Sequence, residues 1–210
     1  MERLRLLRAQ RASKASGGGV MRLFVAIDLD EAARAAVADE QKRLKTAIGE
    51  TRSSIKWVRP DHMHLTLVFL GEVAEAHAPA IVDAINEPVT QAPFDLGFGG
   101  IGVFPPRGAP TVLWVGAVTG AAESIELQRE LADRVRRFGI ALEGRPFHPH
   151  LTLARWKTSR GADRSRALAA GSDGVAATVH VDRATLYQSR LSSAGPTYTP
   201  LARATLSRSG

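Results

Sequence analysis

The tetrapeptide His-Leu-Thr-Leu occurs twice in this chain, at residues 64–67 and 150–153. Both copies lie in apolar stretches, 63–70 and 147–154, whose Leu, Thr, Val and Phe residues favour β-strands. Side chains alternate between the two faces of a strand, so each copy places its His and Thr on one face and its leucines on the other. Two strands that each bury one face and present a His-Thr pair on the other constrain the fold more than any other feature.

The surroundings of the tetrapeptide are repeated as well. Apolar residues at helical spacing predict a helix over 31–48 that ends at Gly49, and another over 121–138 that ends at Gly139. Each helix precedes one copy of the tetrapeptide. The distance between the copies is too long for a solenoid repeat and suits two lobes of one domain. We therefore expect internal pseudo-symmetry, with an active-site cleft between the lobes.

The rest of the pattern mixes strands and helices without regular βαβ units. It predicts strands over 22–28, 54–58, 93–100, 111–118, 175–182, 184–190 and 198–206, and helices over 74–87 and 161–170. This order favours an α+β fold with antiparallel pairing. The expected architecture is two pseudo-symmetric lobes over residues 21–210, each an antiparallel sheet with helices packed outside.

Composition excludes several classes of site. The 210 residues include no cysteine, which excludes disulfides, thiolate metal sites and a cysteine nucleophile. No apolar run approaches the ~20 residues needed to span a bilayer. The formal net charge is +7, and more than half of it lies in the Arg-rich segment 1–20. The remainder of the chain is only mildly basic, a modest argument for an anionic partner.

Segment 1–20 ends in a run of glycines just before Met21. We interpret it as a flexible basic extension upstream of a domain that begins at Met21. It lacks the apolar stretch of a secretory signal. A transit peptide and a basic arm that binds nucleic acid are the alternatives, because both share an Arg-rich and acid-poor composition.

The duplicated motif predicts acid–base chemistry. His64 and His150 can each hold or release a proton near neutral pH, so one can act as base while the other acts as acid. The hydroxyls of Thr66 and Thr152 can donate hydrogen bonds to the oxygen atoms of a substrate. Arg155 offers a planar fork of donors that suits a carboxylate or a phosphate. Its offset from Thr152 points it to the opposite face of a regular strand, so we expect the strand to end just before it.

Other polar and aromatic residues near the motif have less certain roles. His62 and His148 stand two positions before the motif histidines, and four histidines raise the alternative of a transition-metal site. Because Pro149 interrupts strand alternation, we expect His62 and His148 to lie at the mouth of the site. No ring of carboxylates accompanies the histidines, so we expect no metal and no cofactor. Four aromatic residues, each suited to packing or to a place in the cleft, are left unassigned: Trp57, Trp114, Trp156 and Tyr187.

The sequence resembles a known family, the 2H phosphoesterases, named for paired His-x-Thr/Ser motifs. Within it, the chain is similar to the bacterial RNA 2′,3′-cyclic phosphodiesterases, also called 2′-5′ RNA ligases. The resemblance rests on residues 22–27, 57–58, 64–71, 104–105, 113–116, 145–155 and 186–189. It implies metal-independent hydrolysis to a 2′-phosphomonoester. It also implies that His64 protonates the departing 3′ oxygen, that His150 activates water and that Arg155 contacts phosphate.

The resemblance leaves the substrate open. RNA ends or nucleotides bearing a 2′,3′-cyclic phosphate are the expected partners, acted on by a monomer in the cytoplasm without a membrane. Formation and cleavage of 2′-5′ linkages, or hydrolysis of ADP-ribose 1″,2″-cyclic phosphate, would use the same fold. A non-catalytic module that binds RNA ends is a different class. Two intact pairs of titrating groups argue against it, because binding alone needs charge and stacking.

Overall fold

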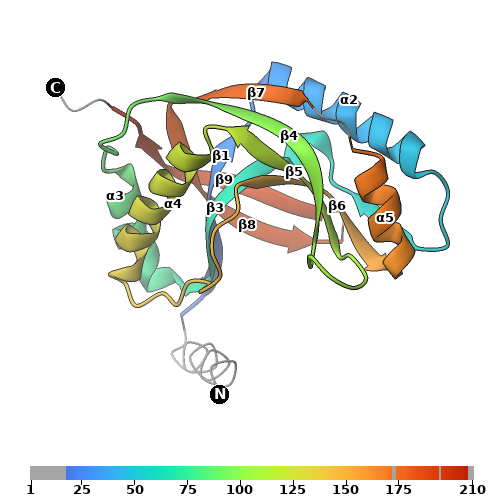
Figure 1. The fold of residues 1–210 in the computed structure, drawn as a ribbon. Coiled ribbons are helices and arrows are strands. Elements are labelled where there is room, and N and C mark those ends of the chain that lie inside the picture. The colour runs from blue at the N-terminus through green and yellow to red at the C-terminus, as the bar shows by residue number, and fades with distance from the viewer. Residues whose placement is uncertain (1–17, 172–173, 194, 208–210) are drawn as a thin grey trace.

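Two antiparallel sheets form the framework of the protein in the computed structural model, which describes residues 18–171, 174–193 and 195–207 (Figure 1). The first sheet has the order β3-β1-β8-β9, made of His64–Ala74, Val20–Asp28, Arg183–Ser192 and Gly195–Thr205. The second sheet has the order β2-β6-β5-β4-β7, made of Ser54–Trp57, His150–Thr158, Val112–Thr119, Phe94–Phe104 and Val175–Val181.

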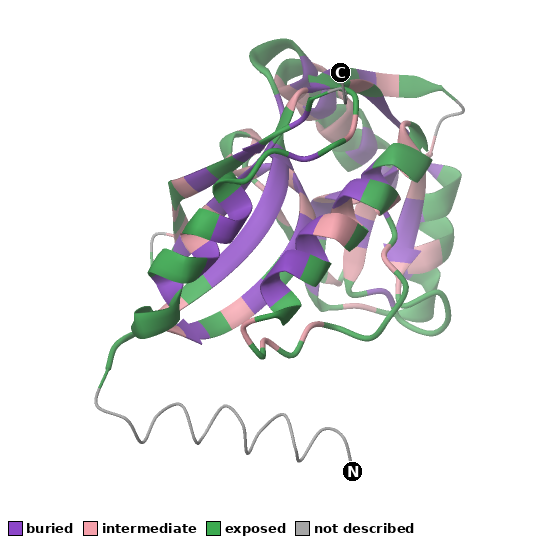
Figure 2. Ribbon diagram, turned by 90° about the vertical axis from the view of Figure 1, so that its left-hand side faces the viewer, coloured by how far each residue is buried: buried purple, intermediate pink, exposed green. Residues whose placement is uncertain are grey.

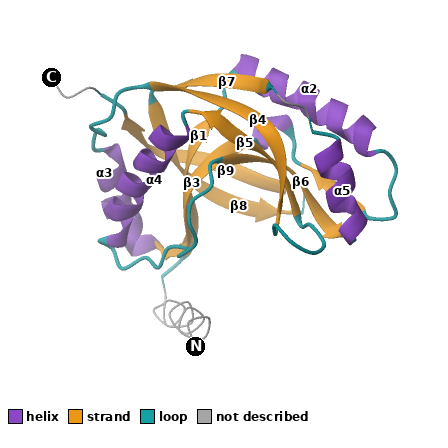
Figure 3. Cartoon of the chain, viewed as in Figure 1, coloured by secondary structure: helices purple, strands orange, loops and turns teal. Residues whose placement is uncertain are grey.

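Helices cover the outer side of each sheet (Figure 3). Helices α3 (Ala78–Asn86) and α4 (Ala121–Arg136) pack on the first sheet, against β9 and β3. Helices α2 (Glu31–Ile48) and α5 (Gly161–Ala169) pack on the second sheet, against β7 and β4. Two short 3₁₀ helices, Pro60–His62 and Glu75–His77, flank β3. The predicted α+β fold, with two antiparallel sheets and outer helices, is confirmed.

The two lobes are not consecutive halves of the chain. Strands β1 and β3 are neighbours in the first sheet, yet α2 and β2, which lie between them in the chain, belong to the second; α4 connects β5 to β6 of the second sheet yet packs on the first. The exchange fuses the lobes into one hydrophobic core, in which Leu23 and Leu65 belong to the same buried cluster as Leu113 and Leu151. Because separating the sheets would expose this shared apolar surface, the core holds the two motif strands in a fixed relation.

Helix α2 has the bounds that its sequence predicts. The side chain of Asp30 accepts a hydrogen bond of 2.7 Å from the backbone N–H of Ala33, which caps the first turn. Gly49, at φ 67°, ends the helix in a conformation that favours glycine. Helix α4 ends at Arg136 rather than at residue 138. Figure 2 looks onto α3 and α4 and shows buried and exposed residues alternating along both helices, as expected for amphipathic helices.

A buried arginine joins the two helices of the first lobe. The guanidinium of Arg134 on α4 is almost fully buried and donates to the carbonyl oxygens of Ala84, Glu87 and Pro88, at 3.2, 2.5 and 2.8 Å. These carbonyls lie in and just after the last turn of α3, where a helix carries partial negative charge. The Glu130 carboxylate completes the set at 2.6 Å. The charge of Arg134 is thus matched within the fold.

The ends of some elements differ from those predicted. Strand β1 begins at Val20, and β6 begins at His150 rather than at residue 147. Strand β6 also continues to Thr158, well past the expected end near Ala154. Residues 1–17 of the predicted basic extension lie outside the described residues. No helix of the described part of the chain is long and apolar enough to cross a membrane.

Candidate active site

The two His-Thr pairs come together where the sheets meet, because β3 and β6 contact each other. On each strand the His and Thr are half-buried, while the intervening leucines, Leu65 and Leu151, are completely buried. The alternation predicted from the tetrapeptide therefore holds in both copies. In the described chain no hydrogen bond involves the hydroxyl of Thr66 or Thr152. Both hydroxyls are thus available to a ligand.

Both motif histidines are fixed in the same way. His64 Nδ1 lies 2.9 Å from the carbonyl oxygen of His62, and His150 Nδ1 lies 2.6 Å from the carbonyl oxygen of His148. Since a carbonyl oxygen only accepts, Nδ1 must be the donor in each ring. The other nitrogen, Nε2, then accepts a proton when the ring is neutral and donates one when it is charged. Each ring is oriented to exchange a proton at Nε2.

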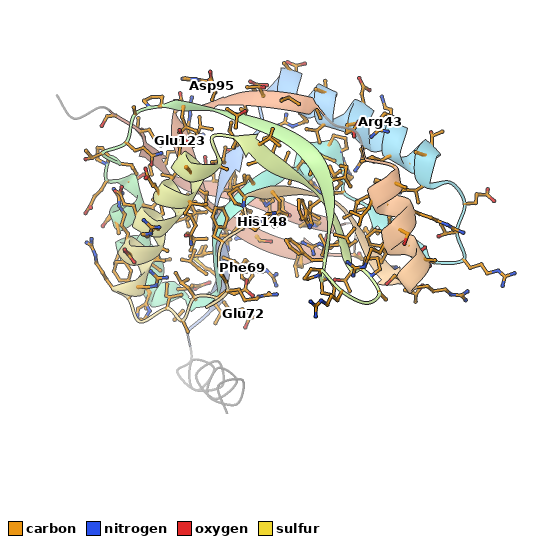
Figure 4. The ribbon with its side chains drawn as sticks, viewed as in Figure 1. Arg43, Phe69, Glu72, Asp95, Glu123 and His148 are labelled. Atoms are coloured by element: carbon orange, nitrogen blue, oxygen red, sulfur yellow. The ribbon has the colours of Figure 1, made fainter. Side chains whose placement is uncertain are left out.

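His62 and His148 act on their neighbours through the backbone. The side chain of His148, labelled in Figure 4, is exposed. Its ring lies 4.8 Å from that of Trp114. The half-buried His62 ring lies 5.5 Å from that of Tyr198. Within the described residues no group of three or more His, Asp or Glu side chains is arranged to hold a metal ion. The four-histidine metal site therefore has no assembled ligand set, and metal independence stays a prediction.

A β-bulge brings Arg155 to the face that carries His150 and Thr152. Opposite β5, Thr152 pairs with Trp114 and Ala154 pairs with Leu113, which leaves Leu153 as an extra residue. An extra residue reverses the alternation beyond it, so Leu153 and Ala154 are both buried and Arg155 is exposed. The expectation that the strand ends before Arg155 was wrong. The strand continues to Thr158, and the bulge turns the Arg155 side chain to the other face.

The first motif strand contains the same bulge. Opposite β1, Thr66 pairs with Ala26 and Val68 pairs with Val25, so Leu67 is the extra residue. Leu67 and Val68 are both buried, and the next residue, Phe69, is exposed. Phe69 therefore occupies in the first sheet the position that Arg155 occupies in the second. The pseudo-symmetry extends beyond the tetrapeptide, but the residue at this position differs.

The charge of Arg155 acts on both histidines. Burial is the main cause that lowers the pKa of His64 and of His150, and the positive charge of Arg155 acts in the same direction on each ring. The same charge also opposes the burial that raises the pKa of Tyr198 on β9. A group that influences residues of both sheets lies close to both. The structure thus brings together all five site residues predicted from the sequence: His64, Thr66, His150, Thr152 and Arg155.

A carboxylate distinguishes the two halves of the site. Asp28, at the end of β1, pairs in register with His64, and its charge favours the protonated ring, which opposes the effect of burial. Its oxygens accept hydrogen bonds from Thr185, at 2.9 Å, and from Tyr187, at 2.8 Å. No carboxylate contributes to the pKa of His150 in the same way. The pKa of Tyr187 is raised to about 12 by burial and by Asp28, so this phenol remains a donor.

Aromatic rings enclose each histidine. His64 stacks on Phe24, with ring centroids 4.8 Å apart, and meets Tyr198 edge-on at 5.3 Å. His150 lies 5.1 Å from Phe104 and 5.9 Å from Trp114. Of these rings, sequence reasoning left Trp114 unassigned and missed the others. Alternation along β1, which places residue 24 on the same face as residue 28, was the only signal for Phe24.

Glycine makes room for one of these rings. A Cβ atom at Gly102 would lie 2.0 Å from the Trp114 indole, so only glycine allows the ring to lie flat across β4. Trp156 is buried, and together with the half-buried Trp57 it lines a hollow of about 390 Å³ beside the end of α2. These two tryptophans belong to packing away from the histidines. Tyr187, the fourth aromatic residue left unassigned from the sequence, lies beside Asp28 in the site.

Comparison with known proteins gives consistent matches over most of the chain. A family model described as the 2′-5′ RNA ligase superfamily matches residues 19–192. An RNA 2′,3′-cyclic phosphodiesterase of Archaeoglobus fulgidus is 36% identical over 183 residues, which cover 86% of this chain and 98% of that protein.

Solved structures share the architecture. A Thermus thermophilus protein has a TM-score of 0.68 and 31% identity, with 90% of this chain and 100% of that chain covered. LigT of Escherichia coli, solved in complex with 3′-AMP, has a TM-score of 0.70 and 27% identity, again covering 90% of this chain and 100% of that chain. The residues matched by the family model include both motif strands.

Proposed function

Since the chain belongs to the 2′-5′ RNA ligase superfamily, we propose that it hydrolyses the 2′,3′-cyclic phosphate of an RNA end or of a nucleotide to a 2′-phosphomonoester. The observation that carries the proposal is the pair of histidines fixed through Nδ1, which leaves one Nε2 in each half of a shared site. The name of the Archaeoglobus fulgidus relative and the 3′-AMP complex of LigT support this substrate class.

The proposed reaction is an in-line displacement at phosphorus. His150 Nε2 takes a proton from a water molecule as the water oxygen bonds to phosphorus. The bond from phosphorus to the 3′ oxygen breaks, and His64 Nε2 gives its proton to that oxygen. The 2′ oxygen keeps the phosphate. One neutral ring and one protonated ring are needed at the start, and their states are reversed at the end.

The asymmetry of the site supports this order of roles. The acid must be protonated before the reaction, and the carboxylate of Asp28 favours the protonated form of His64 alone. The base must be neutral, and burial and the charge of Arg155 favour the neutral form of both rings, so Asp28 is the contribution that separates the two roles. His64 is therefore the better acid and His150 the better base.

Three further side chains would stabilise the charge that develops on the phosphate. The hydroxyls of Thr66 and Thr152 stand on the same faces as the two rings and donate to the non-bridging oxygens. The guanidinium of Arg155 binds the same anion and neutralises its charge. These donors are placed before the substrate arrives, so little reorganisation is needed in the transition state.

Product analysis on a substrate panel tests the proposal. The panel contains 2′,3′-cyclic nucleotides, a 2′-5′-linked dinucleotide and ADP-ribose 1″,2″-cyclic phosphate, and phosphorus NMR distinguishes 2′- from 3′-phosphate. We expect turnover of the cyclic nucleotides to the 2′-phosphate, unchanged by excess chelator. Preferential turnover of another member of the panel would identify that compound as the substrate instead. Tight binding of RNA ends without turnover would favour the non-catalytic module.

The remaining proposals concern context. We propose that residues 21–210 act as one catalytic domain, preceded by a basic extension, and that the protein works as a monomer in the cytoplasm. The exchange of α2 and α4 between the sheets supports one domain, because neither lobe has a separate core. Sedimentation of the full chain tests the monomer, and truncation to residue 21 followed by an activity assay tests the extension.

A further inference from the structure

The strongest feature that the proposed reaction does not use is an exposed phenylalanine beside the site. Phe69 has 48% of its surface exposed and is the one aromatic residue among the exposed large hydrophobic residues of the described chain. The bulge at Leu67 returns it to the face of β3 that carries His64 and Thr66. Arg155, the counterpart of Phe69 in the second sheet, faces the same site. An aromatic ring thus occupies the position where pseudo-symmetry would place a second phosphate ligand.

An arginine holds this ring in place. The guanidinium carbon of Arg22 lies 4.9 Å from the centroid of the Phe69 ring, within the range of a cation–π contact. The cation covers one face of the ring, and none of the ion pairs found among the described residues involves Arg22. Its donors are therefore free for an anion that lies next to the ring.

Arg22 also lines a groove. A hollow of about 360 Å³ lies at the ends of β1, β3 and β8 and is lined by Arg22, Glu72, Glu75, Ser189 and Arg190, among others. Glu72 pairs with Arg22 in register, and Figure 4 shows that Phe69 and Glu72 follow each other along β3 below His148. Two arginines and two glutamates nearly balance its charge. Net charge alone therefore does not explain what the groove binds.

The chemistry of the substrate limits what can reach this groove. A 2′,3′-cyclic phosphate occupies both lower hydroxyls of its ribose, so the RNA can continue only through the 5′ oxygen. Thr66 lies opposite Ala26 and Phe69 opposite Phe24, so the two are ~7 Å apart along the sheet, about twice the ~3.4 Å rise of one stacked nucleotide. In the proposed function, the rings that surround the two histidines would flank the terminal nucleoside. A ligand on Phe69 therefore belongs to the chain on the 5′ side.

We propose that Phe69, held by Arg22, is the stacking platform for a base of the nucleotides that precede the cyclic phosphate. Arg22 would meet the backbone phosphate next to that base. Stacking on an aromatic ring accepts any base, which suits an enzyme that acts on RNA ends of varied sequence. The inference rests on the proposed function and adds to it that the protein distinguishes oligonucleotide ends from free cyclic nucleotides.

The test compares two substrates in each variant: a single 2′,3′-cyclic nucleotide and a tetranucleotide with the same cyclic end. We expect Phe69→Ala to lower the ratio of kcat/KM for the tetranucleotide to kcat/KM for the mononucleotide about 10-fold or more, since each stacked base typically contributes that much. Phe69→Tyr keeps the ring and should keep the ratio. Leu168→Ala is the matched control, because Leu168 is similarly exposed, at 46%, on α5.

Binding provides an independent measurement. Fluorescence anisotropy with a labelled tetranucleotide that ends in a 2′-phosphate should show Kd raised about 10-fold in Phe69→Ala and unchanged in Leu168→Ala. An unchanged ratio together with an unchanged Kd would overturn the platform, whereas the proposed function would stand if the wild type still hydrolyses both substrates. If the wild type hydrolyses neither, the proposed function fails, and the Kd comparison still decides on the platform.

Discussion

Thr152 and Arg155, although three residues apart on β6, project from the same face of their sheet because Leu153 forms a bulge between them. The bulge is fixed from the helix side. Gln41 on α2 donates through Nε2 to the carbonyl oxygens of Leu153, at 2.9 Å, and of Val58, at 2.8 Å. The helix that crosses from the first sheet to the second therefore holds the backbone that aims Arg155.

Replacement of Gln41 should consequently impair catalysis from a distance. Gln41→Leu removes the donor at similar size, leaves two carbonyl oxygens with fewer partners and lets the bulge relax. We expect kcat/KM for a cyclic nucleotide to fall ~10–100-fold, because small displacements of catalytic groups carry large effects. The loss should disappear when Arg155 is already alanine, since the two residues would act as one unit. Multiplicative losses in the double variant would mean that Gln41 acts by another route.

The charge of Asp28 should set one limb of the pH profile. Burial and Arg155 lower the pKa of both histidines below their ordinary 6.5, so the kcat/KM profile of the free enzyme should be centred below that value. The charge of Asp28 opposes this lowering of the pKa in His64. Asp28→Asn removes that charge, lowers the pKa of His64 and moves the basic limb to lower pH, because the acid loses its proton sooner.

The acidic limb in that experiment belongs mainly to His150 and should stay in place, although the two limbs strictly describe the coupled pair. Measurement of kcat/KM from about pH 4.5 to about pH 9, a range that brackets the ordinary histidine pKa, in wild type and in Asp28→Asn decides between the roles. A shift confined to the acidic limb would assign the base to His64 instead, and identical profiles would show that Asp28 does not influence the ring.

Arg134 should matter for stability more than for chemistry. Arg134→Met keeps the buried methylenes but deletes the donors to Ala84, Glu87 and Pro88. Unpaired carbonyls and lost charged hydrogen bonds should reduce the free energy of unfolding by ~2–4 kcal/mol in urea titrations. Arg136→Met is the control on the same helix, where an exposed pair with Asp133 should contribute less than ~1 kcal/mol. Equal losses in both variants would contradict this account.

Local features of the sequence predicted local structure well. The alternation in His-Leu-Thr-Leu placed His64, Thr66, His150 and Thr152 correctly, and apolar spacing together with Gly49 predicted the bounds of α2. These features depend on neighbours in the chain, so propensity and periodicity are enough to find them.

Features that depend on distant partners could not be predicted. A bulge exists only relative to the strand beside it, so the extra residues Leu67 and Leu153 carry no signal of their own. Asp28 reaches its partners Thr185 and Tyr187 only when β1 pairs with β8. The exchange of α2 and α4 between the sheets follows from tertiary packing, which the helix pattern does not specify.

The last prediction concerns the two histidines as a pair. Each ring is fixed through Nδ1 and works through Nε2, so His64→Ala and His150→Ala should each lower turnover of a 2′,3′-cyclic nucleotide by at least ~10²–10⁴. The double variant should lose much less than the product of the two, because acid and base act in one step. His77→Ala, which removes an exposed histidine outside the site, is the control. Circular dichroism must show that all variants fold. A folded single variant with a large fraction of wild-type turnover would exclude that ring as acid or base, and multiplicative losses would refute a concerted pair.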